Sequence, residues 1–145
     1  MRLRFLCPHH RALIEADPSR ARSSRELSHS KALEFRQRGA TEQSIAAAGC
    51  ALEAAEALLV LHGCRSAQDL RRFTDAAVLL RQTLPALRQP GLVRGLLAGC
   101  HARLEALMAD GADTRLVLEC CQRLAGAEAP ATAAIAATTR RATLH

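Results

Sequence analysis

Aromatic side chains are scarce in this chain of 145 residues, which has no tryptophan, no tyrosine and only three phenylalanines. A β-sandwich or β-barrel draws its core from β-branched and aromatic residues, so this scarcity argues against a β fold. Alanine and leucine supply most of the apolar content, and both are strong helix formers. We therefore expect an all-α protein with one domain over residues 1–125, followed by an Ala/Thr-rich helix or flexible tail over residues 126–145.

Long apolar runs are also missing. Arg2 and Arg4 precede only a short apolar stretch that ends at Pro8, which is too short for a secretory signal. The longest run, at residues 57–61, falls well short of a membrane span. We therefore expect a cytoplasmic protein with no membrane partner, whose six cysteines stay reduced.

The sequence lacks the common catalytic motifs. It has no glycine-rich phosphate loop, no G-x-S-x-G elbow and no pair of carboxylates at catalytic spacing. Cys100 and His101 are neighbours, but adjacent residues on a helix diverge by about 100°. We therefore expect no catalytic residue, no cofactor and no enzymatic activity.

One stretch near the start, LCPHH, has metal-ligand spacing. Cys7 and His10 form a C-x-x-H pair, but a structural zinc site needs four ligands. His62 and Cys64 are a conceivable second half, although they flank a turn glycine. The alternative that we favour assigns no metal: residues 5–7 pack against the helices, Pro8 opens a helix, and His9 and His10 are exposed.

Capping residues, glycines and prolines divide the chain into helices. Pro8 opens the first, Thr41 caps the third and Ser66 caps the fourth, with Asp69 three residues later in a variant capping box. Pro85 either kinks the fourth helix or starts a new one, and Asp113 or Thr114 caps the sixth. The expected helices span residues 8–16, 19 or 24–38, 41–61, 66–88, 91–109 and 114–125.

Apolar residues recur at helical spacing within these segments. In the fourth, the stripe has offsets of 0, 3, 7, 10, 14 and 17: Leu70, Phe73, Ala77, Leu80, Leu84 and Leu87. Short loops between long amphipathic helices favour antiparallel neighbours. The pattern therefore predicts stacked antiparallel helical hairpins.

Residues 25–58 resemble one tetratricopeptide repeat. The resemblance lies in a small residue, an aromatic three positions later, a turn glycine and small residues in the second helix: Ala32, Phe35, Gly39, Ser44 and Ala51-Leu52. The match covers about a quarter of the chain, and the closing proline of the family is Glu56 here. A true solenoid needs at least about three repeats, and only one is recognisable in this sequence. The resemblance therefore implies a short array of about five or six helices.

The resemblance also implies a function, since such repeats bind peptides or proteins through their first helices. The matching positions in this sequence are Glu26, His29, Leu33, Arg36 and Gln37. An arginine among them suits an acidic peptide or a chain terminus, because guanidinium binds carboxylate with two hydrogen bonds. The same residues also fit an ordinary solvated helix face.

Basic residues give an alternative function. The net charge is +6, and residues 1–38 carry nine basic groups against four acidic ones. Arginines at 2, 4, 11, 20, 22 and 25 would form a patch for nucleic-acid phosphates. The chain offers few aromatic rings for base stacking, so a nucleic-acid-associated regulator is the second hypothesis.

Self-association is a further expectation. A stack of so few helices leaves an outer face of apolar residues without a cover. Val60, Val78 and Leu79 are the candidates for such a face, and a homodimer would bury them.

Overall fold

The computed structural model describes residues 4–126, which form six α-helices and one short 3₁₀ helix. The all-α fold class predicted from the sequence is confirmed, and the described residues contain no strand. The elements, in chain order, are α1 (Pro8–Ala16), α2 (Pro18–Gln37), α3 (Thr41–Val60), α4 (Ala67–Thr83), the 3₁₀ helix η1 (Leu84–Leu87), α5 (Pro90–Ala109) and α6 (Thr114–Gly126).

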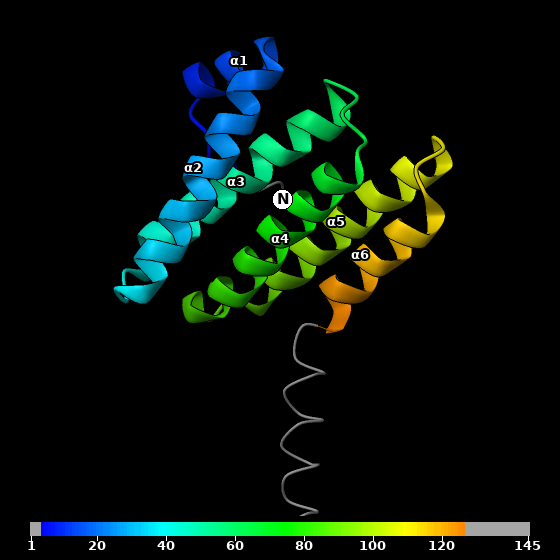
Figure 1. Cartoon of the computed structure of the whole chain (residues 1–145). Coiled ribbons are helices and arrows are strands. Elements are labelled where there is room, and N and C mark those ends of the chain that lie inside the picture. Colours follow the sequence, from blue (N-terminus) through cyan, green and yellow to red (C-terminus); the bar gives the residue numbers. More distant parts are fainter. Residues whose placement is uncertain (1–3, 127–145) are drawn as a thin grey trace, which may run out of the picture.

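Helix α3 lies at the centre of the packing. It packs along α2 on one side and α4 on the other, and α1 also contacts it. On the far side of α3 from α2, helices α4, α5 and α6 pack on one another. Helices α1, α2 and α3 therefore form one end of the described structure, and α4, α5 and α6 form the other (Figure 1). The predicted stacking of antiparallel helical hairpins stays a prediction. The predicted division of the chain at residue 125 also stays a prediction.

Most helix starts follow from local side-chain chemistry. The Ser66 hydroxyl accepts a hydrogen bond from the Asp69 amide (3.1 Å) and donates one to the Asp69 carboxylate (2.7 Å), as the capping box predicts. Asp17 and Asp113 cap α2 and α6 in the same way, each accepting from an amide two residues later at 2.9 Å. The prediction for Thr41 was wrong: it is the first residue of α3, after Ala40, which makes no side-chain cap.

Pro85 ends α4 without starting a full helix. The chain tightens into the 3₁₀ helix η1. Proline fits the first turn of this helix, because the backbone N–H that proline lacks would have no hydrogen-bond partner there. Arg88 then takes a left-handed conformation (φ 53°), which turns the chain toward α5. This turn shortens the predicted fourth helix by five residues and leaves Leu87 38% exposed.

Small residues let α2 and α3 cross closely. Ala32, Ser44 and Ala51 are completely buried, and the Ser44 hydroxyl donates a hydrogen bond to the Ala32 carbonyl at 2.9 Å. Gly39 joins the two helices with φ 72°, a conformation that glycine adopts without strain. These are the positions on which the tetratricopeptide resemblance depends, although the crossing alone does not establish the family.

Helix α3 is apolar enough to raise the question of a membrane. Its 20 residues pass a length and hydropathy test for a membrane-spanning helix, and 56% of the tested window is buried within the protein. Ten of its residues are buried, among them Ile45, Leu52 and Leu59. This is the burial expected of a central core helix, whose apolar character serves packing against α1, α2 and α4.

The predicted outer apolar face is partly wrong. Leu79 is 4% exposed, because α4 is covered on more than one side, and Val78 packs partly against the same core. Val60 remains 45% exposed at the end of α3, beside Leu61 at 57%. Homodimerisation therefore stays a prediction with a smaller apolar patch than expected.

We predict that Ala32→Leu destabilises the protein, because a leucine has no room at the α2–α3 crossing. Overpacking of this kind costs about 1–3 kcal/mol. The matched control is Ser30→Leu, which introduces leucine at an exposed position of the same helix. Urea unfolding followed by circular dichroism measures both, and equal midpoints for the two variants would contradict the close crossing.

Candidate functional site

The five predicted binding residues lie on α2. Glu26, Leu33, Arg36 and Gln37 are exposed, and His29 is half-buried. Leu33 is 43% exposed, and the residues one helical turn away on the same face, His29 and Gln37, are polar. The described structure therefore places all five where solvent or a partner reaches them to some extent, without showing what they bind.

Two of these residues reach across to α4. The Arg36 guanidinium donates a hydrogen bond to the Gln82 side-chain oxygen at 2.9 Å. Ten residues earlier, the Glu26 carboxylate lies 3.4 Å from the Arg72 guanidinium. The predicted site is thus a surface shared by α2 and α4, which we call the α2–α4 surface.

A buried ion pair lies beneath one end of this surface. Arg25 is 3% exposed; its Nη2 donates to Glu26 at 3.1 Å, and its Nη1 lies 3.7 Å from an Asp69 carboxylate oxygen. Burial lowers the pKa of the Arg25 guanidinium, and the nearby Arg72 lowers it further, whereas Glu26 and Asp69 oppose the shift. Arg25 Nη1 makes no hydrogen bond, so its contact with Asp69 is electrostatic only, and removing Asp69 would leave this buried cation without its neighbouring charge.

A large groove, which the sequence patterns above did not predict, lies elsewhere, between α3 and α5. Its volume is about 970 Å³, and it shares no residue with the five predicted binding positions. Phe73 and Leu80 of α4, Leu52 of α3 and Leu92 and Leu96 of α5 line it with apolar side chains. We call it the α3–α5 groove.

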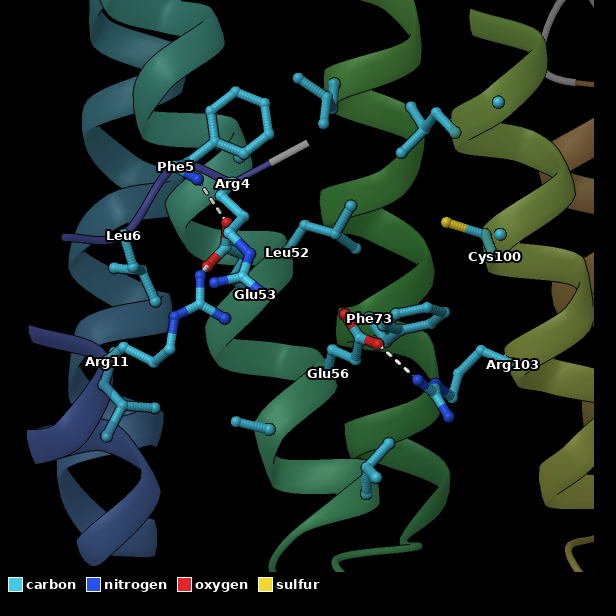
Figure 2. Close-up of a pocket in the computed structure, with 18 of the residues that line it drawn as sticks. Arg4, Phe5, Leu6, Arg11, Leu52, Glu53, Glu56, Phe73, Cys100 and Arg103 are labelled. Carbon is cyan, nitrogen blue, oxygen red and sulfur yellow. Dashed lines mark hydrogen bonds and ion pairs between the residues drawn. The ribbon is translucent and has the colours of Figure 1, made fainter. Parts of the chain in front are cut away.

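Two ion pairs lie in the α3–α5 groove (Figure 2). Glu53 accepts a hydrogen bond from Arg11 at 2.6 Å and another from the backbone amide of Phe5. Glu56, one helical turn further along α3, pairs with Arg103 of α5 at 2.6 Å. The first pair ties the N-terminal segment and α1 to α3, and the second spans the groove from α3 to α5.

Glycines form the α5 side of the groove. Gly91, Gly95 and Gly99 recur at four-residue spacing on one face of α5, and all three line the groove. A Cβ atom built at any of them meets no atom within 4 Å, so the space above this face is open. Glycine in a helix interior costs about 1 kcal/mol relative to alanine, so the sequence gives up helix stability along this face. This glycine spacing is visible in the sequence, and it is the feature from which an open face on α5 could have been predicted.

The composite metal site is not formed. Cys7 and His10 do meet, with Sγ and Nδ1 3.3 Å apart, but His62 Nε2 contacts the Ile14 carbonyl at 3.0 Å. Cys64 instead accepts a hydrogen bond from Arg22 at 3.2 Å. Within residues 4–126 no group of three or more metal-ligating side chains comes together. Phe5 and Leu6 pack as expected, but Cys7 is exposed, contrary to our prediction, because it caps the N-terminus of α1.

The basic patch proposed for nucleic acid is smaller than the sequence suggested. Arg25 is buried, Arg11 is paired with Glu53, and Arg22 is turned toward Cys64. Arg4 and Arg20 are exposed, and Arg2 lies outside the described residues. Burial thus removes Arg25 from the predicted patch, while Arg4, Arg20 and Arg22 remain exposed.

Cys100 faces the groove as an unreactive thiol. It is 5% exposed, and burial, together with the Glu56 carboxylate, raises its pKa from 9.0 to about 12. The thiolate is the nucleophilic form of cysteine, so this residue is protonated at neutral pH. The Cys100–His101 neighbours thus lack the electropositive, accessible setting that a catalytic cysteine needs.

Comparison with known proteins gives no relative: no family model, no curated protein and no solved structure matches the chain. The tetratricopeptide resemblance, the function and the partners therefore depend on the residues and the geometry described above.

We predict that iodoacetamide at pH 8 alkylates Cys7 and spares Cys100 in the folded protein. A thiol pKa three units above normal cuts the thiolate fraction about a thousandfold, and burial slows the reaction further. Peptide mass spectrometry after timed quenching measures the rate at each cysteine, and unfolding in urea is the control in which both react. Rates within tenfold of each other in the folded state would contradict the burial of Cys100.

Proposed function

We propose that this protein is a non-enzymatic, cytoplasmic interaction module of tetratricopeptide-like type that binds a peptide or protein partner on the α2–α4 surface. The observation that carries the proposal is the pair of cross-helix contacts, Glu26 with Arg72 and Arg36 with Gln82. These contacts join the predicted α2 residues to α4, the helix that follows α3. Such a two-helix surface supports binding because alternate helices, each followed by one helix of the core, present their side chains to one partner.

The chemistry of this surface favours an acidic partner with an apolar side chain. Leu33, at 43% exposure, lies one turn before Gln37 and gives an apolar contact in the middle of a polar helix face. Among residues 4–126, the partner of Arg36 is neutral: the Gln82 amide oxygen, at 2.9 Å. A carboxylate would replace that oxygen favourably, because a charge-assisted hydrogen bond is about twice as strong as a neutral one.

We predict that Arg36→Glu weakens partner binding at least tenfold, since it repels a carboxylate at the end of the surface where Arg36 meets Gln82. The matched control is Lys31→Glu, the same charge reversal at an exposed position on a different face of α2. A partner is first recovered on the immobilised wild-type protein and identified by mass spectrometry, and its dissociation constant is then measured by calorimetry for all three proteins. Equal affinity for wild type and Arg36→Glu, or equal loss in both variants, would overturn the proposed surface.

A salt titration separates this proposal from the nucleic-acid hypothesis. Binding through phosphate contacts loses affinity steeply between about 50 and 200 mM salt, because counterions are released. We expect no salt-dependent binding of a labelled random duplex or single strand in fluorescence anisotropy. Tight binding that falls with salt would favour the arginine-rich regulator instead.

A further inference from the structure

We propose that Cys7 and Cys50 are a redox pair: Cys7 exchanges with a low-molecular-weight disulfide, and Cys50 then completes an intramolecular disulfide with Cys7. Both thiols are free in the described structure, which is therefore the reduced state of the pair. The disulfide would fasten the N-terminal segment, residues 4–7, and α1 to α3. In the cytoplasm such disulfides are mainly transient and redox-sensing. Neither cysteine belongs to the α2–α4 surface, so the pair does not depend on its binding a partner.

The contacts of the N-terminal segment bring Cys7 to the part of α3 that carries Cys50. The Phe5 ring fills the space where a Cβ on Gly49 would lie, and the Phe5 amide donates a hydrogen bond to Glu53. These two contacts lie on either side of Cys50 in the α3 sequence. Cys7 follows Phe5 by two residues, which span at most about 7 Å. The segment is thus anchored within reach of Cys50.

The register of α1 on α3 gives the same placement. Arg11 pairs with Glu53, which lies 42 residues further along the chain, at 2.6 Å. Figure 2 shows the chain from Phe5 to Arg11 running beside α3 in the direction that α3 itself takes. Cys7 and Cys50 have nearly the same separation in the sequence as Arg11 and Glu53. Because parallel helices rise equally per residue, this register places Cys7 beside Cys50.

The electrostatics of Cys50 agree with this placement. Burial raises the pKa of the Cys50 thiol, and the Glu53 carboxylate and Cys7 raise it further. Cys7 has this effect because a negative charge on its sulfur opposes the ionisation of a thiol close to it. The raised pKa keeps Cys50 protonated at neutral pH, so Cys50 is the second of the two thiols to react.

Cys7 is the thiol that reacts first. It is exposed, whereas Cys50 is partly buried. Its Sγ lies 3.3 Å from Nδ1 of His10, and an imidazole within hydrogen-bond reach is the usual base for a cysteine nucleophile. The same Sγ accepts a hydrogen bond from the His10 amide at 3.5 Å as the N-cap of α1, and the first turn of α1 carries no acidic residue. A thiolate at this position therefore finds a donor and no carboxylate on its own helix.

The exchange has two steps, in which atoms and electrons balance. His10 takes the proton of Cys7, and the thiolate attacks one sulfur of the small disulfide, whose S–S bond breaks and releases a thiolate that takes up the proton. The Cys50 sulfur then loses its proton and attacks Cys7 Sγ in the mixed disulfide, which releases the second small thiol. Two protein thiols are oxidised to one disulfide, and one small disulfide is reduced to two thiols. Because Cys7 is uncharged in the mixed disulfide, it no longer opposes the ionisation of Cys50.

The test is incubation of the folded full chain with glutathione disulfide, acid quenching, and peptide mass spectrometry without reduction. We expect Cys7 to gain one glutathione first, and a peptide linked through Cys7 and Cys50 to follow. In glutathione redox buffers, the effective concentration of the two thiols should be at least roughly tenfold higher in the folded chain than in urea, because the fold holds them together.

Cysteine variants identify the second thiol. Cys50→Ser should stop the reaction at the mixed disulfide on Cys7. The matched control is Cys64→Ser, at another partly exposed cysteine, and this variant should still form the link between Cys7 and Cys50. Thermal melts followed by circular dichroism check that each variant is folded, and the wild-type measurement decides the proposal without either variant.

His10→Gln tests the proton acceptor, because glutamine keeps a hydrogen-bonding side chain but takes no proton at neutral pH. We expect the mixed disulfide at Cys7 to form roughly tenfold more slowly, since less of the thiol is present as thiolate. Added imidazole should restore the rate, and the final yield of the linked peptide should stay unchanged. His9→Gln, at the neighbouring exposed histidine, is the control and should react at the wild-type rate.

Several results would overturn the proposal. These are a wild-type chain in which Cys7 never links to Cys50, a link from Cys7 to Cys64 or to a second chain instead, or equal effective concentrations in the folded chain and in urea. Equal rates for His10→Gln and His9→Gln would remove His10 as the proton acceptor. None of these outcomes changes the test of the α2–α4 surface, which uses Arg36 and measures the affinity for a partner.

Discussion

The close packing of α3 against its neighbours is the constraint on which the rest of the structure depends. Ala48, Ala51, Ala54 and Ala55 of this helix are at most 2% exposed, and side chains this short let α2 and α4 approach its axis. Because interiors are packed to crystal-like density, such positions tolerate little added volume. A protein with only three phenylalanines thus builds its core from many short contacts between helices instead of a few large side chains.

The positions of the α2–α4 surface and the α3–α5 groove follow from which helices pack on each side of α3. On one side the long arginine side chains of α2 reach α4: Arg36 contacts Gln82, and Arg25 lies buried near Asp69. On the other side α5 packs mainly against α4 and α6, through buried residues in its second half such as Cys100 and Leu104. Its glycine-rich first half has no buried residue, and the α3–α5 groove opens there.

Local features of the fold were predictable from the sequence, and long-range ones were not. The apolar stripe from Leu70 to Leu84 is buried as its spacing predicts, and Ser66 caps α4 because capping needs only neighbouring residues. The burial of Arg25 and Leu79 was missed because it depends on which helices lie next to α2 and α4. The groove was missed for the same reason: the glycine spacing on α5 was visible, but its distance from α3 is a tertiary property. Residues 127–145, for which a helix or tail was expected, lie outside the described residues.

Amide hydrogen exchange measured by mass spectrometry tests the central role of α3 most directly. Amides in the middle of a fully packed helix exchange only through global unfolding, whereas those of a half-packed helix open locally at lower free energy. We expect the slowest exchange in α3, around Ala48 to Ala55. Exchange in the glycine-rich first half of α5, around Gly91 to Gly99, should be at least a hundredfold faster. Since each factor of ten corresponds to about 1.4 kcal/mol, this ratio is a difference of about 2.8 kcal/mol in opening free energy. Equal protection of the two segments, or faster exchange in α3, would contradict it.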